Sequence, residues 1–167
     1  MEPRLPQLEL DNQLCFALYD ASRAMTRAYG PLLAELGLTY PQYLTMLVLW
    51  EAEGPMSVGD IGARLHLDSG TLTPLLKRLA ELGFVQRARD AADERRVLIS
   101  LTKVGTALRA RAVGVPAQVA RCCAMDLASA AALLNDLKSL AAALDGRPSP
   151  DQGPAITSTA PRSQEAP

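Results

Sequence analysis

Hydrophobic residues recur with a helical period along most of the chain. The first such segment predicts a helix from about Leu8 to Ala28, with Tyr29–Pro31 interrupting or kinking it, because proline cannot donate a backbone hydrogen bond. One apolar stripe of this helix consists of Leu10, Leu14, Leu18, Ala21 and Met25. The neighbouring stripe is semi-polar and consists of Cys15, Tyr19, Ser22, Thr26 and Tyr29. The pattern therefore places a thiol beside an apolar face, on a stripe whose candidate donors are hydroxyls.

Three shorter helices are predicted next, each with its own start and stop signals. The segment "TYPQYLTMLVLWEAEG" has a core face of Leu44, Leu47 and Val48. The segment "SVGDIGARLHL" begins with a serine and carries an acid three residues on, a weak capping box. In "DSGTLTPLLKRLAELGF", Asp68 or Ser69 caps the helix, and we expect Pro74 to loosen its first turn. The buried stripe of that helix is Leu72, Leu75, Leu76 and Leu79.

The period then changes from helical to alternating. "FVQRARDAADERRVLISLT" predicts a β-hairpin with a charged tip, since apolar residues alternate in its second strand. Thr102 can cap a helix that extends through about Cys122, and a last helix is predicted from about Leu127 to Leu144. From Gly146 onward the chain is rich in proline and polar residues, which predicts disorder over 146–167.

This order of elements is that of a winged helix-turn-helix, a mainly α fold with a small β-hairpin. The candidate recognition helix presents short hydroxyls at its start and cations one turn later, which suits contacts with phosphates and base edges in a DNA groove. The candidate DNA-binding residues of this helix are Ser69, Thr71, Thr73, Lys77 and Arg78.

The hairpin tip mixes arginines with carboxylates. Asp93 lies two residues before Arg95, where a carboxylate can orient the guanidinium. An oriented arginine at a hairpin tip suits insertion into a narrow, electronegative minor groove. Asp93, Arg95 and Arg96 are therefore further candidate DNA-binding residues, and the predicted partner is double-stranded DNA.

Composition limits the class of protein without specifying it. The chain has 167 residues, of which 49% are hydrophobic and 21% charged, as expected for one globular domain with tails. Its net charge of −1 means that any DNA-binding charge must be local. Without a signal-peptide pattern, a membrane-span-length apolar run or a disulfide framework, we expect a cytoplasmic protein with no membrane contact. We expect no cofactor, and a metal site built from His66, Cys122 and Cys123 lacks suitable spacing.

From about Leu10 to Leu144 the chain resembles the multiple-antibiotic-resistance (MarR) family of winged-helix repressors. The "DxR" of Asp93–Arg95 followed by "VLISLT" matches that family's wing. "LCFALYDASRAMTRAY", "LTYPQYLTMLVLWE" and "LDSGTLTPLLKRL" resemble its organic hydroperoxide regulators (OhrR). The resemblance implies one domain over 1–145 and a homodimer on a palindromic operator. Within this domain, 41–102 would bind DNA, and 8–35 and 103–145 would dimerise.

The resemblance also implies a redox role. Cys15 matches the peroxide-sensing thiol of these regulators, and Tyr29 and Tyr40 match tyrosines that donate hydrogen bonds to it across the dimer interface. Tyr19 matches a residue lining the same pocket. We expect Cys15 in the second turn of its helix, with a lining of Leu14, Phe16 and Met46 that favours organic hydroperoxides over hydrogen peroxide.

Cys122 and Cys123 are the candidates for resolving an oxidised Cys15. Adjacent helical positions point about 100° apart, so only one of the two can face the first helix well, and the sequence leaves the choice open.

Two alternatives remain open at this stage. A repressor of the same fold could respond to a small phenolic or lipophilic ligand, with Cys15 merely packed. A thiol peroxidase could instead turn over hydroperoxide at Cys15, although it would leave the basic hairpin without a role. The sequence shows no catalytic triad or phosphate-binding loop, so we expect a regulator rather than an enzyme.

Overall fold

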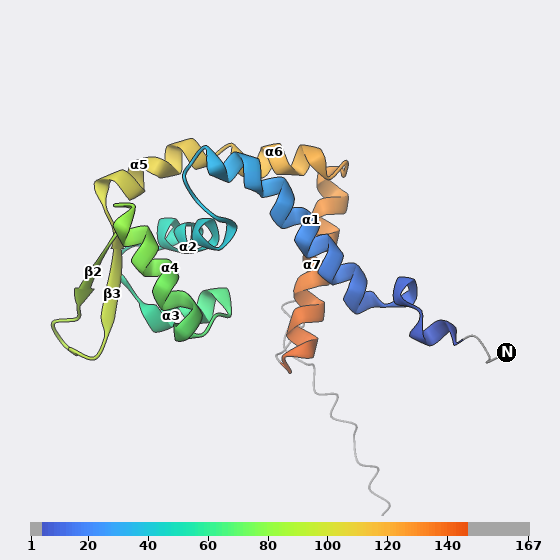
Figure 1. The fold of residues 1–167 in the computed structure, drawn as a ribbon, viewed down its shortest axis with the longest axis horizontal. Helices are drawn as coiled ribbons and strands as arrows, with labels where there is room; N and C mark the ends of the chain where they lie inside the picture. Colours follow the sequence, from blue (N-terminus) through green and yellow to red (C-terminus); the bar gives the residue numbers. More distant parts are fainter. Residues whose placement is uncertain (1–4, 147–167) are drawn as a thin grey trace, which may run out of the picture. The chain divides into compact units, whose positions relative to one another are not determined.

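A computed structural model of the chain describes residues 5–146, except for the side chain of Leu127. Two 3-10 turns come first, η1 (Pro6–Leu8) and η2 (Leu10–Asn12). They are followed by α1 (Leu14–Ala34), α2 (Tyr40–Glu51), β1 (Met56–Ser57), α3 (Val58–Leu65), α4 (Ser69–Glu81), β2 (Val85–Arg89), β3 (Val97–Leu101), α5 (Lys103–Ala112), α6 (Val115–Cys122) and α7 (Leu127–Leu144) (Figure 1). The tail predicted over 146–167 lies, apart from Gly146, outside the described residues. The chain divides into two units between Cys122 and Cys123, which we describe separately.

The N-terminal helix differs from the prediction at both ends. It begins at Leu14, because the Asn12 and Gln13 side chains donate to the carbonyls of Pro6 and Gln7 at 2.9 Å and 2.8 Å. Such local side-chain bonds compete with helix formation. The predicted interruption at Tyr29–Pro31 is absent, and α1 continues through Pro31 to Ala34. Leu33 is only 1% exposed, so its side chain packs this last turn against the core. Cys15 therefore lies in the first turn of α1, not the second.

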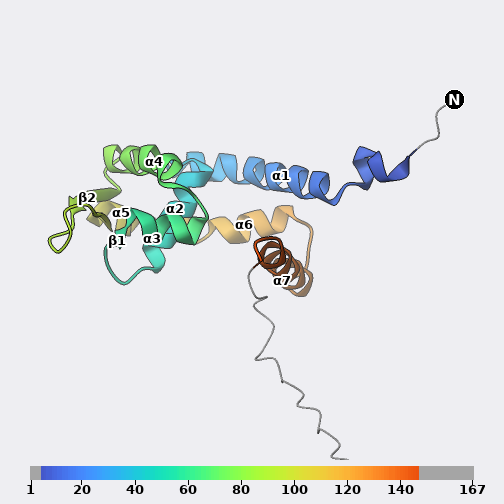
Figure 2. The ribbon, with the colours of Figure 1, turned by 90° about the horizontal axis from the view of Figure 1, so that it is seen from below.

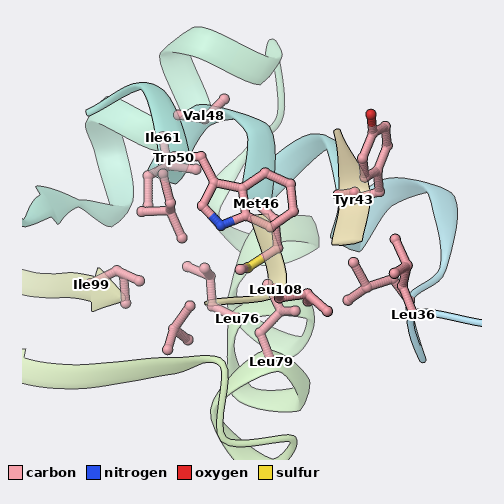
Figure 3. Close-up of a cluster of buried hydrophobic side chains, with 14 of the residues drawn as sticks. Leu36, Tyr43, Met46, Val48, Trp50, Ile61, Leu76, Leu79, Ile99 and Leu108 are labelled. Atoms are coloured by element: carbon pink, nitrogen blue, oxygen red, sulfur yellow. The ribbon is translucent and has the colours of Figure 1, made fainter. Parts of the chain in front are cut away.

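Helix α2 runs through the centre of the first unit. In Figure 1, α1, α5 and α6 lie on one side of it and α3 and α4 on the other. The predicted core face was only partly right, since Val48 is buried but Leu47 is 40% exposed. Tyr43, Met46 and Trp50 are buried in the core instead (Figure 3). A helix packed on several sides has no single buried stripe, so the hydrophobic period does not identify which of its residues are buried.

The helix-turn-helix is fixed by caps at both helix starts. Ser57 Oγ accepts from the Asp60 amide at 3.1 Å at the start of α3, and Asp68 caps α4. His66 ends α3 in the left-handed conformation, with φ of 54°. Helix α4 is continuous through Pro74, so the expected loosening does not occur.

The predicted hairpin is confirmed and carries an additional strand. The sheet is antiparallel in the order β1-β3-β2, with Val85 opposite Leu101 and Met56 opposite Ile99. Strand β1 has only two residues, too few for a periodic pattern, and was not predicted. Figure 2 shows the β2–β3 hairpin projecting from the end of the first unit.

The helix predicted from Lys103 to about Cys122 is two helices. Val113 and Gly114 separate α5 from α6, where a glycine followed two residues later by Pro116 weakens helix continuation. The start of α5 is held by the Trp50 indole, which donates to the Gly105 carbonyl at 2.9 Å. Its last turn is held by Arg111, which donates to the Glu35 carbonyl beyond α1 at 2.6 Å.

The second unit contains α7, whose predicted bounds are confirmed. Asp126 caps it by accepting from the Ser129 amide at 2.7 Å. Its apolar face is exposed in the single chain, with Leu133, Leu137 and Leu144 at 46%, 40% and 76%. Within residues 5–146, no helix combines the length and apolar character needed to cross a membrane.

Candidate functional site

Helix α4 presents the predicted polar residues on its open face. Ser69, Thr71, Thr73, Lys77 and Arg78 are all exposed. The opposite face buries Leu72, Leu76 and Leu79, each at most 1% exposed, against the core. The structure therefore leaves all five side chains accessible, on a helix oriented by its apolar face.

The start of α4 is ordered by Asp68. Its carboxylate accepts from the Thr71 amide at 2.9 Å and from the Thr71 hydroxyl at 2.8 Å. These two bonds lower the pKa of the Asp68 carboxyl. The Thr73 hydroxyl donates to the Ser69 carbonyl at 2.6 Å. Two of the predicted hydroxyl donors thus donate within the helix itself.

The cations of α4 differ in their partners. Arg78 pairs with Glu81 at 3.1 Å, one turn further along the same exposed face. Lys77 makes no ion pair within the described part of the chain, so its ammonium group is available to a phosphate or a base edge.

Asp93 organises the hairpin tip through the backbone. Its carboxylate accepts from the Arg95 amide at 3.0 Å, and its carbonyl accepts from the Arg96 amide at 2.9 Å. The expectation that it orients the Arg95 guanidinium was wrong. An Asx-type turn offers the nearer backbone amide as donor. The Arg95 side chain is exposed and stays available at the tip.

Arg96 lies against α3 and not toward the tip. Its guanidinium contacts the Asp60 carboxylate at 3.5 Å, and the Ser57 hydroxyl donates to the same carboxylate at 2.6 Å. The Ser57 hydrogen bond, followed by Arg96, lowers the pKa of Asp60. Because the partners lie 36 positions apart, sequence spacing could not reveal this ion pair, which links the β2–β3 hairpin to α3.

Cys15 is exposed near the N-terminal end of α1. As the second residue of the helix, it lies among the first-turn amides, which carry a partial positive charge. Leu14 beside it is 63% exposed and Tyr19 is 55% exposed. Met46 is fully buried in the core at 0% exposure, so its predicted place in the thiol lining was wrong.

Tyr29 and Tyr40 are brought together at the other end of α1. Their ring centroids are 5.1 Å apart, and Tyr43 lies 5.7 Å from Tyr29. Burial, followed by the nearby Tyr29 and Tyr40, raises the pKa of Tyr43. Tyr43 is buried in the core, and its ring supports that of Tyr29, one of the two predicted thiol donors.

One chain does not bring Cys15 to this tyrosine pair. Since an α-helix rises about 1.5 Å per residue, the Cα atoms of Cys15 and Tyr29 lie about 21 Å apart along α1.

The two other cysteines lie at the end of α6. Cys122 is its last residue, and its thiol donates to the Gln118 carbonyl at 3.5 Å. Cys123 follows, and both side chains are exposed. Among residues 5–146, no group of three or more His, Cys, Asp or Glu side chains could hold a metal ion.

A separate cavity of about 420 Å³ lies between α2 and the α5–α6 junction. Its lining includes Tyr43, Leu47, Trp50, Arg109 and Val113. It is mostly apolar, with an arginine at its edge.

The fold, the polar face of α4 and the basic hairpin define a winged-helix DNA-binding regulator. Residues 27–110 match the family described as transcriptional regulator SarA/Rot. The chain belongs to this MarR/SarA family of winged-helix transcriptional regulators, which are not enzymes, as the sequence predicted.

Two relatives share 51% identity with the chain. One is the HTH-type transcriptional regulator TtmR of Methylorubrum extorquens (strain PA1), aligned over 90% of this chain and 76% of the relative. The other is the organic hydroperoxide resistance transcriptional regulator of Bacillus subtilis (strain 168), aligned over 71% of this chain and 80% of the relative. The predicted resemblance to this subfamily is confirmed.

Solved structures of AbfR of Staphylococcus epidermidis share the fold at 36% identity. Reduced AbfR bound to DNA matches with a TM-score of 0.73, covering 84% of this chain and 95% of that chain. Disulfide-formed AbfR matches with a TM-score of 0.58, covering 84% and 92%.

Proposed function

We infer that this protein is a redox-sensing repressor, which binds operator DNA as a reduced homodimer and is released when an organic hydroperoxide oxidises Cys15. The observation that carries this proposal is an exposed thiol in the first turn of α1. Over 119 residues the chain is also 51% identical to an organic hydroperoxide resistance regulator.

Two copies of the chain complete the sensing site. Because Tyr29 and Tyr40 lie at the far end of α1 from Cys15, they serve as thiol donors only to a second copy that packs antiparallel along α1. The exposed apolar side chains of the N-terminal segment supply surface for such packing: Leu8, Leu10 and Leu14 are 74%, 57% and 63% exposed. Burying such surface is the main driving force of association.

The chemistry begins with attack of the Cys15 thiolate on the hydroperoxide. The S–O bond forms as the O–O bond breaks, so the sulfur becomes a sulfenic acid and the organic part leaves as an alcohol after taking up a proton. The sulfenic acid condenses with a second thiol to a disulfide and releases water. Cys122 or Cys123 of the other copy is the proposed second thiol, and a disulfide-formed relative is consistent with this route. A disulfide requires the two Cα atoms to lie within about 7 Å, so helices further apart when reduced must move.

On DNA, the proposed roles follow from the exposed surfaces. The start of α4, with Ser69, Thr71 and Lys77, enters the major groove, and Arg95 at the wing tip enters the minor groove. Two copies read half-sites about 34 Å apart, and a shift of the dimer helices removes this spacing. AbfR has been crystallised on DNA in its reduced form.

A gel shift on the protein's own upstream DNA tests the proposal at fixed salt. Reduced protein should bind, organic hydroperoxide should release it, and Cys15→Ser should bind with or without peroxide. Release of Cys15→Ser by peroxide, or no release of the wild type, would contradict the proposal.

The cavity between α2 and α5–α6 favours one alternative, a repressor released by a small lipophilic or phenolic ligand. In that case peroxide leaves DNA affinity unchanged, and Leu47→Trp, which fills the cavity, abolishes ligand-induced release.

A further inference from the structure

We propose that Asp60 of α3 is a positioning residue for DNA binding, which fixes the wing tip, residues 90–96 between β2 and β3, through the side chain of Arg96. This inference rests on the proposed entry of Arg95 into the minor groove. It also gives Arg96 a different role from the predicted DNA contact, because Arg96 would act on DNA only by holding the tip.

The carboxylate of Asp60 is itself fixed at the start of α3. One of its oxygens, Oδ2, accepts from the Ser57 hydroxyl at 2.6 Å and contacts Arg96 Nη2 at 3.5 Å. Ser57 is only 7% exposed, and its Oγ accepts from the Asp60 amide at 3.1 Å. As the last residue of β1, Ser57 also lies opposite Leu98 of β3. Asp60 therefore presents a fixed negative charge beside the start of β3, where the chain returns from the tip.

The backbone of Arg96 closes the wing tip. Its carbonyl accepts from the Asp90 amide at 3.0 Å, and its amide donates to the Asp93 carbonyl at 2.9 Å. The Asp93 carboxylate accepts from the Arg95 amide at 3.0 Å. Arg96 is thus bonded to α3 through its side chain and to both sides of the tip through its main chain. A restraint on Arg96 is therefore a restraint on the neighbouring Arg95.

The effect of Asp60 on DNA binding has a sign that separates positioning from simple charge. The two side chains are 51% and 61% exposed, so their ion pair contributes little to folding. A tip already held in one position, however, loses less conformational freedom when it enters a groove, which favours binding. Charge alone predicts the opposite, because a carboxylate repels phosphates and its neutralisation should strengthen binding.

The test is the affinity of the reduced, full-length protein for its own upstream DNA, measured by gel shift at fixed salt. Asp60→Asn should weaken binding about threefold per bound copy, the size expected for one exposed ion pair. Arg96→Gln, which leaves the Ser57 cap of α3 intact, should weaken it similarly, and the double variant no further. In an Arg95→Gln background, Asp60→Asn should have no additional effect, since the side chain that it positions is gone.

Glu94→Gln is the matched control, because it makes the same carboxylate-to-amide change at an exposed position of the tip and should not weaken binding. Without DNA, hydrogen exchange at the Asp90 and Arg96 amides should accelerate in Asp60→Asn and Arg96→Gln but not in Glu94→Gln.

Three results would overturn the positioning role while DNA binding stands: Asp60→Asn binding as well as or better than the wild type, equal weakening by Glu94→Gln, or a full effect of Asp60→Asn in the Arg95→Gln background. A wild-type protein that does not bind its upstream DNA would instead overturn the proposed function. Unchanged hydrogen exchange in Asp60→Asn and Arg96→Gln would then also show that the ion pair does not hold the tip.

Discussion

Gly105 occupies a position where the chain has no room for a side chain. A Cβ there would lie 1.9 Å from the Phe84 carbonyl oxygen, and the Gly105 carbonyl accepts the Trp50 indole. This single residue lets the start of α5 lie directly against the strand that leads into the wing.

Gly105→Ala should therefore lower the free energy of unfolding by about 1–3 kcal/mol or more, because the Phe84 backbone must shift. Urea denaturation followed by circular dichroism measures this. Gly59→Ala is the matched control, since its Cβ would meet only Ser57 Oγ at 3.7 Å and should change stability little. Equal stability of the two variants would refute the close approach.

The choice between Cys122 and Cys123 is a second question at this scale. If either resolves oxidised Cys15, only one of Cys122→Ser and Cys123→Ser should abolish the peroxide-induced, disulfide-linked dimer on a non-reducing gel. Loss in neither variant would mean that the sulfenic acid is not resolved by this pair. We expect both variants to bind DNA normally when reduced.

The candidate site could be predicted from the sequence residue by residue, but its contacts could not. The motifs identified Cys15, the tyrosines and the polar face of α4. The ion pair of Arg96 with Asp60 and the hydrogen bond from Arg23 to the Tyr19 hydroxyl depend on side-chain directions, which a pattern of residue types does not contain. The contact of the buried Tyr43 ring with Tyr29 is likewise absent from such a pattern.

Among the elements, the starts of α3, α4 and α7 were predicted well, whereas the start of α1 and the continuity of the helices were predicted poorly. The caps at Ser57, Asp68 and Asp126 are local, so the sequence nearby specifies them. Whether α1 passes through Pro31, or a helix breaks at Gly114, depends on burial such as that of Leu33, which is set by distant residues.

The cap of α4 gives a pH dependence with a definite sign. The folded protein lowers the pKa of Asp68 below its ordinary value of 3.8, so the stabilisation is fully present above that value and is lost as pH falls through the lower folded value. Asp68→Asn keeps a capping oxygen that does not titrate. Hydrogen exchange at the Thr71 amide should accelerate on acidification in the wild type, relative to Asp68→Asn. Identical acid profiles would contradict this account.

At the scale of the whole molecule, the proposed sensing site requires a dimer. We expect sedimentation equilibrium to show a dimer, and Leu133→Glu combined with Leu137→Glu to shift it toward monomer and weaken DNA binding. These side chains place exposed apolar surface on α7. Lys138→Glu, on a polar position of the same helix, should leave the dimer intact. A dimer that persists when Leu133→Glu and Leu137→Glu are combined would exclude α7 from the interface.

The central claim is that the reactive site belongs to two copies of the chain, and mixed dimers test it most directly. One copy carries Cys15→Ser, and the other carries Tyr29→Phe and Tyr40→Phe, which alone should slow Cys15 oxidation about tenfold by removing two donors. In the mixed dimer, the remaining Cys15 faces the intact tyrosines of the other copy, so it should oxidise at the wild-type rate. Oxidation as slow as in the double-tyrosine homodimer would contradict the claim.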